Sequence, residues 1–220
     1  MDIFVLHLNT SIMRKLMTLL LVLAVSSCGK VEDNTLRDAN ESIMGKYECT
    51  SMIWNGGSID LDNDGIASED IMAEFSNMDL CQIVIETPLR IKEAQEIGQY
   101  MDFYLEVPMQ DIRYSKVDDT YELLNSAYGN GMSLGFAFII DSKGNISLRA
   151  NRENDSVLTN EYPDFIEHYE YQFTSADEIS LLSPGIIVAK VKSAYFDHLT
   201  REMVYGETEY RYERISYSYM

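Results

Sequence analysis

The chain has 220 residues, of which 36 are acidic and 17 basic, giving a formal net charge of −19. Such an acidic surface repels phosphate backbones, which argues against a nucleic-acid partner. The length is enough for one domain with a proper core, and we expect a single domain rather than two.

An export signal opens the chain. Two basic residues, Arg14 and Lys15, precede an apolar run that ends at Val25 and has the length of the hydrophobic part of a secretory signal. The ending Val-Ser-Ser-Cys28 resembles the lipobox of bacterial lipoproteins, in which the cysteine is acylated and the chain is cut just before it. The resemblance implies a signal peptide over residues 1–27 and a cell-envelope protein held at its membrane by lipid on Cys28.

The alternative is a transmembrane helix from Ile3 to Val25. It would place Arg14 and Lys15 near the middle of the bilayer, at a cost of about 2.5 to 3.5 kcal/mol each. If the segment is a signal peptide, the first twelve residues either belong to a long n-region or lie before a true start at Met13. The sequence favours the signal peptide and leaves the start open.

Residues 28–42 are polar, lack aromatic side chains and show no helical or strand period. We expect a flexible acidic tether here, followed by one folded domain over residues 43–220. Within the tether, Lys30-Val-Glu-Asp33 resembles the acidic export signal of surface-exposed lipoproteins of the Bacteroidetes. That resemblance implies an outer-membrane anchor with the domain outside the cell. A solvated linker would also be acidic, so the periplasmic face stays open.

The folded part begins with an aromatic and β-branched run, Lys46 to Trp54, which predicts a strand closed by a turn at Asn55-Gly-Gly57. A short helix should follow from Glu69 to Asn77, because Ile71, Phe75 and Met78 recur at helical spacing.

The loop between this strand and this helix, Asp60-Leu-Asp-Asn-Asp-Gly65, has acids at alternate positions before a glycine, as an oxygen-ligand loop for calcium requires. A full loop needs a bidentate glutamate at the twelfth position, where this chain has Ile71. We therefore expect either weak calcium binding, with a dissociation constant of about 10⁻⁴ to 10⁻³ M, or a plain turn with Ser68 capping the helix. The candidate ligands are Asp60, Asp62, Asp64 and Asp70.

From Leu80 onward apolar residues alternate with polar ones, which predicts short strands. Asp141 to Gly144 predicts a hairpin turn. The pattern indicates an all-β fold with one short helix, either an antiparallel barrel or a β-sandwich. The expected strands are Leu80 to Glu86, Met101 to Val107, Leu134 to Ile140, Asn145 to Ala150, Glu170 to Phe173, Glu178 to Leu182, Ile187 to Phe196 and Glu207 to Ile215.

The order of these features resembles the lipocalin-like lipoproteins of the Bacteroidetes. The features are the lipobox, Trp54 just before a turn, the Asp60 loop leading into a short acidic helix, many strands, and a last strand with Tyr210-Arg-Tyr-Glu-Arg-Ile215. The resemblance implies a small up-and-down β-barrel with an early helix near one mouth, and no catalytic residues. Typical lipocalins begin with a Gly-x-Trp pair, which is absent from this chain.

Motifs for catalysis are few. His168 and His198 each stand alone after the signal segment, and no nucleophile elbow, zinc-binding helix or phosphate loop is present. We expect a non-enzymatic module, with no required cofactor, that binds a small ligand, a glycan or a partner protein. The alternative is an envelope hydrolase of glycosidase type that uses paired carboxylates such as Asp118 and Asp119, although acids are too abundant for one pair to stand out.

Two covalent features complete the expectations. Asp155-Ser156-Val157 resembles the O-glycosylation site of exported Bacteroidetes proteins, which marks Ser156. Cys49 and Cys81 are the remaining thiols once Cys28 is lipidated, and an exported chain can keep a disulfide between them. Two buried free cysteines are the alternative.

Overall fold

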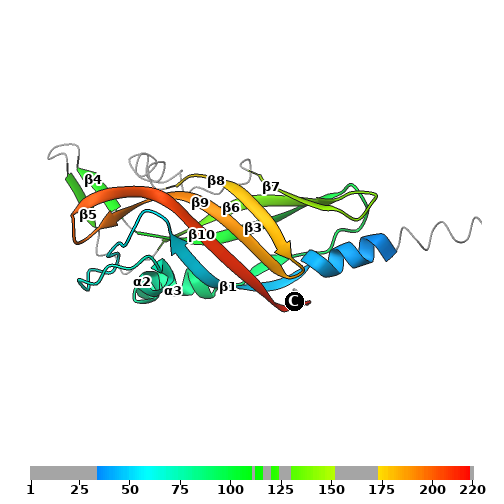
Figure 1. Ribbon diagram of the computed structural model, residues 1–220, viewed down its shortest axis with the longest axis horizontal. Coiled ribbons are helices and arrows are strands. Elements are labelled where there is room, and N and C mark those ends of the chain that lie inside the picture. The colour runs from blue at the N-terminus through cyan, green and yellow to red at the C-terminus, as the bar shows by residue number, and fades with distance from the viewer. Residues whose placement is uncertain (1–33, 111, 116–119, 124–129, 152–172, 219–220) are drawn as a thin grey trace, which may run out of the picture.

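The computed structural model describes residues 34–110, 112–115, 120–123, 130–151 and 173–218. The described chain is mostly β, and its curled antiparallel sheets form a half-barrel (Figure 1). The described elements are a helix that includes residues 34–43, β1 (Gly45–Trp54), α2 (Ile71–Ser76), α3 (Asp79–Glu86), β2 (Leu89–Ile91), β3 (Tyr100–Met109), β4 (Ile112–Ser115), β5 (Thr120–Leu123), β6 (Asn130–Ile140), β7 (Ile146–Ala150), β8 (Phe173–Ser183), β9 (Ile186–Asp197) and β10 (Glu202–Ser216).

The described strands form two larger sheets and one small pair. The first sheet has the order β2-β1-β10-β9-β8, the second has the order β3-β6-β7, and β4 pairs with β5. Strand β7 lies beside β8, and β2 beside β3, but neither of these pairs is joined by a ladder of hydrogen bonds. The predicted antiparallel β class is therefore confirmed as a mostly β fold, but the described residues contain three helices instead of the one expected. The described strands leave the barrel wall without a ladder between β7 and β8 and between β2 and β3.

The alternation of apolar and polar residues correctly predicts which side of a strand is buried. Ala189, Val191 and Tyr195 of β9 are buried, while Lys190 and Lys192 point outward. Strand β1 alternates as well, but its register shifts between Cys49 and Ser51, where a β-bulge changes which residues face inward. The core thus lies between the two sheets, with α2 and α3 packed over β1 and β3.

The strand predicted over Leu80 to Glu86 is wrong, because this segment forms helix α3. Cys81 and Ile85 are buried one turn apart, and exposed Gln82 donates to the carboxylate of Glu86 at 2.8 Å. The run of Ile83, Val84 and Ile85 favours a strand by propensity, but burial of one helical side outweighs that preference.

The flexible tether is also wrong over its described part, because residues 34–43 are helical. Ala39 and Ile43 are buried and Leu36 packs against the core, so that an apolar stripe recurs at helical spacing. Asn40 is buried too, and its amide group exchanges two hydrogen bonds of 2.9 Å with the backbone of Ala94. The helix is therefore part of the folded domain.

Several expectations fall outside the described residues. These are the signal segment with Cys28, the acids Asp118 and Asp119, Ser156 and His168. Among the residues that are described, no helix is both long and apolar enough to cross a membrane.

Candidate functional site

The Asp60 loop is held by its own acidic side chains. The carboxylate of Asp60 accepts hydrogen bonds from the backbone N–H of Asn63 at 2.8 Å and of Gly65 at 3.0 Å. Asp62 accepts from the N–H of Asp64 at 3.1 Å. The φ of Gly65 is 87°, a conformation that glycine adopts without steric cost, so this residue makes the bend.

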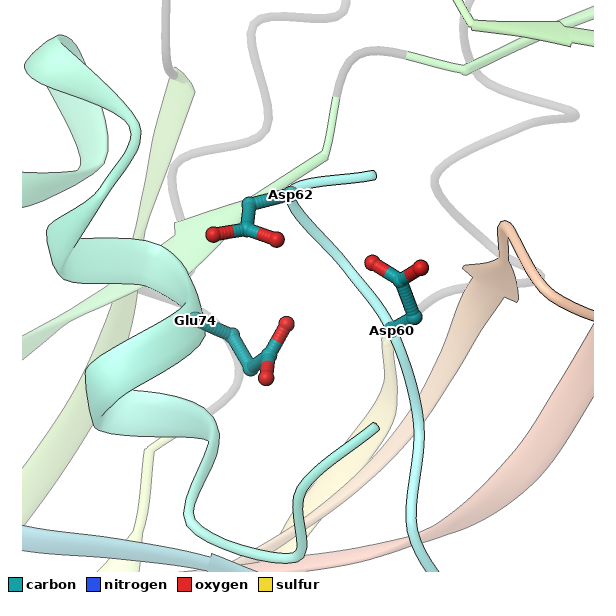
Figure 2. Close-up of side chains that lie close together, drawn as sticks. All are labelled: Asp60, Asp62 and Glu74. Atoms are coloured by element: carbon teal, nitrogen blue, oxygen red, sulfur yellow. The ribbon is translucent and has the colours of Figure 1, made fainter. Parts of the chain in front are cut away.

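Three carboxylates converge beside this loop. Oxygen atoms of Asp60, Asp62 and Glu74 lie within 4.8 Å of one another, and Figure 2 shows Glu74 reaching from α2 toward the loop. Asp60 is 1% and Glu74 6% exposed, while Asp62 is half-buried. Glu74 accepts a hydrogen bond of 2.9 Å from the N–H of Leu61, which joins the helix to the loop.

The structure brings together only two of the four predicted ligands, Asp60 and Asp62. Asp64 is exposed and accepts from the N–H of Ile66 at 2.7 Å. Asp70 accepts from the N–H of Met72 at 3.2 Å, and so Asp70, rather than Ser68, is the N-cap of α2. The prediction that Asp64 and Asp70 join the other two is therefore wrong for this structure.

Glu74 is the residue that sequence reasoning missed. A glutamate was sought twelve positions along the loop, at Ile71, and Glu74 lies three residues later on the same side of α2. The available signal is that Glu74 lies three residues after Ile71, which places it on the same side of the predicted helix as this buried residue. Burial raises the pKa of Glu74, the charges of Asp62 and Asp60 raise it further, and the N–H of Leu61 opposes this shift.

This cluster could hold one divalent cation, because carboxylate oxygens are the ligands that calcium prefers. Among the described residues no lysine or arginine forms a salt bridge with any of the three acids. However, Asp60 and Glu74 already accept backbone N–H groups, which gives both residues a role in fixing the loop. The geometry is thus compatible with both a weak calcium site and a plain turn, the two structures that the sequence predicts for this loop.

A hollow of about 430 Å³ lies at the seam between β7 and β8. Its aliphatic lining comes from the inward faces of two strands, Ile146 and Leu148 of β7 and Ile179 and Leu181 of β8, which pack against the core. The remaining lining residues are small or polar without charge: Ser42, Gly144, Ser180, Ser183 and Pro184. The volume falls within the range of about 300 to 1,000 Å³ that is typical of small-molecule sites.

The hollow and the carboxylate cluster lie at opposite ends of strand β9. Pro184, at the hollow, lies two residues before the start of β9, whereas Asp197 at its end accepts a hydrogen bond of 3.1 Å from the N–H of Asp60. At about 3.3 Å per residue, a twelve-residue strand separates its ends by more than 30 Å. The acids therefore cannot act on a ligand in the hollow.

Cys49 and Cys81 are both buried and free in the structure, so the predicted disulfide is not formed. Cys81 lies on helix α3, and its Sγ lies 3.5 Å from the carbonyl oxygen of Met109, while the Sγ of Cys49 lies 3.6 Å from that of Ser51. Burial raises the pKa of each thiol to about 12, which makes both poor nucleophiles.

The ring of His198 makes an edge contact with Phe196, with ring centres 5.5 Å apart. The backbone N–H of His198 donates to the carbonyl oxygen of Asp60 at 3.0 Å.

No protein-family model, curated protein or solved structure matches this chain. The resemblance to lipocalin-like lipoproteins therefore stays a prediction. So do the lipidation of Cys28 and the O-glycosylation of Ser156, which lie outside the described part of the chain.

Proposed function

We propose that the chain is a lipoprotein anchored to the outer membrane through Cys28, and that it acts as a non-enzymatic binding module. The hollow between β7 and β8 takes the apolar part of a small ligand. The half-barrel is then an incomplete lipocalin-like barrel whose wall is interrupted at this seam.

The observation that carries the proposal is the composition of the hollow. Four aliphatic side chains line a concavity of about 430 Å³, and none of the lining residues is charged. Burying apolar ligand surface there contributes about 25 cal/mol per Å², while the hydroxyls of Ser42, Ser180 and Ser183 offer hydrogen bonds to a polar group.

The other ligand classes find less support in the hollow. Sugar rings commonly stack on aromatic side chains, and none of the lining residues is aromatic. A partner protein is expected to need a larger patch than this concavity.

The hydrolase alternative is also less well supported. The carboxyl groups of glycosidases are about 5 to 9.5 Å apart, with the scissile bond between them. One oxygen from each of Asp60, Asp62 and Glu74 lies within 4.8 Å of the others. Asp60 and Glu74 are almost fully buried and already accept backbone N–H groups, which leaves little room for a sugar.

The test is a fluorescence titration of the purified protein with N-phenyl-1-naphthylamine, an uncharged probe that becomes bright in apolar surroundings. Leu181→Glu places a charge in the hollow, and we expect at least about tenfold weaker binding, which corresponds to 1.4 kcal/mol. Leu182→Glu is the matched control, because Leu182 is the next residue of β8 and is 62% exposed on the outer face. Equal binding by both variants would refute the site.

A further inference from the structure

The hollow lies at the end of the half-barrel where the helix of residues 34–43 joins it. Ser42, in the last turn of this helix, lines the hollow, and its carbonyl oxygen accepts a hydrogen bond of 2.9 Å from the N–H of Gly185. Thr35 packs on Gly144, where a Cβ atom would lie 3.0 Å from its methyl group. The helix extends outward from this end of the barrel (Figure 1).

This helix is fixed in place rather than loosely attached. The guanidinium of Arg214, from β10, donates to the carbonyl oxygens of Glu41 at 2.7 Å and Met44 at 3.1 Å. A cation at a helix C-terminus also interacts favourably with the helix dipole. The direction of the helix relative to the hollow is therefore set by contacts with the last strand.

The stretch between Cys28 and the described helix is short. Cys28 comes six residues before residue 34, and six residues span at most about 20 Å even when fully extended. The ten described helical residues add about 15 Å. If Cys28 carries lipid, these lengths keep the hollow within about 35 Å of the bilayer surface.

The exposed side chains at this end of the molecule are of the kind found at membrane surfaces. Leu182 near the end of β8, and Ile215 and Tyr217 at the end of β10, are all more than half exposed. Aromatic and aliphatic side chains of this kind are favourable at a membrane interface. The net charge of −19 disfavours lipids with anionic headgroups.

We infer that the hollow binds an acyl chain of a zwitterionic phospholipid from the membrane that anchors the protein. This inference rests on the proposed function and adds to it the class of the ligand and its source. The acyl chain lies against Ile146, Leu148, Ile179 and Leu181, and the headgroup stays at the open side of the hollow.

The test uses the lipidated protein reconstituted in phosphatidylcholine vesicles that contain a trace of phosphatidylcholine with a nitroxide on one acyl chain. Electron paramagnetic resonance should show an immobilised lipid component of about one lipid per chain, beyond that of the anchor alone. Leu181→Glu should reduce this component at least tenfold. Leu199→Glu should leave it unchanged, because Leu199 is 55% exposed just after β9, at the opposite end of the barrel from the hollow. Far-ultraviolet circular dichroism of both variants establishes that they are folded.

The outcomes separate the inference from the function on which it rests. If the naphthylamine probe binds wild type in a Leu181-dependent manner but no immobilised lipid is seen, the inference is wrong and the proposed function stands. If immobilised lipid appears in the Cys28→Ser variant alone, the protein's own acyl group fills the hollow and the inference is again wrong. If neither probe nor lipid binds, both proposals fail.

Discussion

The surroundings of Glu74 disfavour the charged form of its carboxyl group. It lies on the buried side of α2, with Asp60 and Asp62 nearby, and burial together with these charges raises its pKa. The folded protein therefore binds this proton more readily than the unfolded chain does. Stability from this group is complete below the ordinary pKa of about 4.5 and is lost as pH rises through the raised value.

Glu74→Gln should raise the melting temperature at pH 7 by a few degrees when EDTA removes divalent cations. Glutamine keeps an oxygen for the N–H of Leu61 and removes the repulsion from the two aspartates. The difference from wild type should shrink as the pH falls toward 4.5. Thermal unfolding followed by circular dichroism between pH 4 and 8 measures it.

Glu69→Gln provides the control, because it makes the same change of charge at an exposed position just before the helix. Glu69→Gln should change the melting temperature little at any pH between 4 and 8. A lower melting temperature for Glu74→Gln at pH 7 in EDTA would show that the charged form is itself needed for folding.

At the scale of elements, the sequence was most informative where one face of a strand is buried. The alternation in β3, β6, β9 and β10 predicted each of these strands, because inward residues must be apolar and outward residues can be polar. The turn at Asp141 to Gly144 was also predictable, since Asp141 accepts from the backbone N–H groups of both Lys143 and Asn145.

The two missed helices have a common cause. In α3, β-branched residues carry a strand preference, and in residues 34–43 polar residues hide the apolar stripe. Both segments are helical because their buried sides pack on strands that are distant in the sequence. Glu74 was missed for a related reason, since its approach to Asp60 depends on where α2 packs rather than on the spacing in the loop. A single sequence does not contain such tertiary information.

A side chain of β10 helps to hold the helix of residues 34–43 in place. Arg214→Met keeps much of the packing but removes the charged hydrogen bonds to the carbonyl oxygens of Glu41 and Met44. We expect a loss of about 2 kcal/mol in the free energy of unfolding and faster amide exchange in residues 39–44 than in the strands. Chemical denaturation and hydrogen-exchange mass spectrometry measure the two effects.

Arg90→Met is the matched control, since Arg90 is exposed on β2. Its replacement should leave the free energy of unfolding within about 0.5 kcal/mol of wild type and should not change amide exchange in residues 39–44. Unchanged exchange in residues 39–44 of Arg214→Met would show that Ala39, Asn40 and Ile43 hold the helix without help from the arginine.

The whole molecule folds against its own charge. A net charge of −19 on one domain produces repulsion that is weaker in the expanded unfolded chain. The Debye length falls from about 30 Å at 0.01 M salt to about 8 Å at 0.15 M, so salt should relieve this repulsion.

The melting temperature should therefore rise by a few degrees between 10 mM and 150 mM sodium chloride at pH 7.5. Scanning calorimetry measures the rise, and potassium chloride at the same concentrations should reproduce it because the effect is one of screening. A melting temperature that falls with either salt would indicate that attractive ion pairs outweigh the net repulsion.

The gap between β7 and β8 also affects how copies of this protein meet one another. An exposed strand edge offers unpaired N–H and C=O groups to any similar strand, and such edges nucleate aggregation. Here β7 and β8 face each other across the seam without a hydrogen-bonded ladder. Cα atoms of the two strands come within 8 Å of each other, whereas a strand inserted and paired between them would need about 9.5 Å. Each strand thus blocks access to the other's edge. The seam therefore leaves the wall without a continuous ladder and still offers no template for fibres.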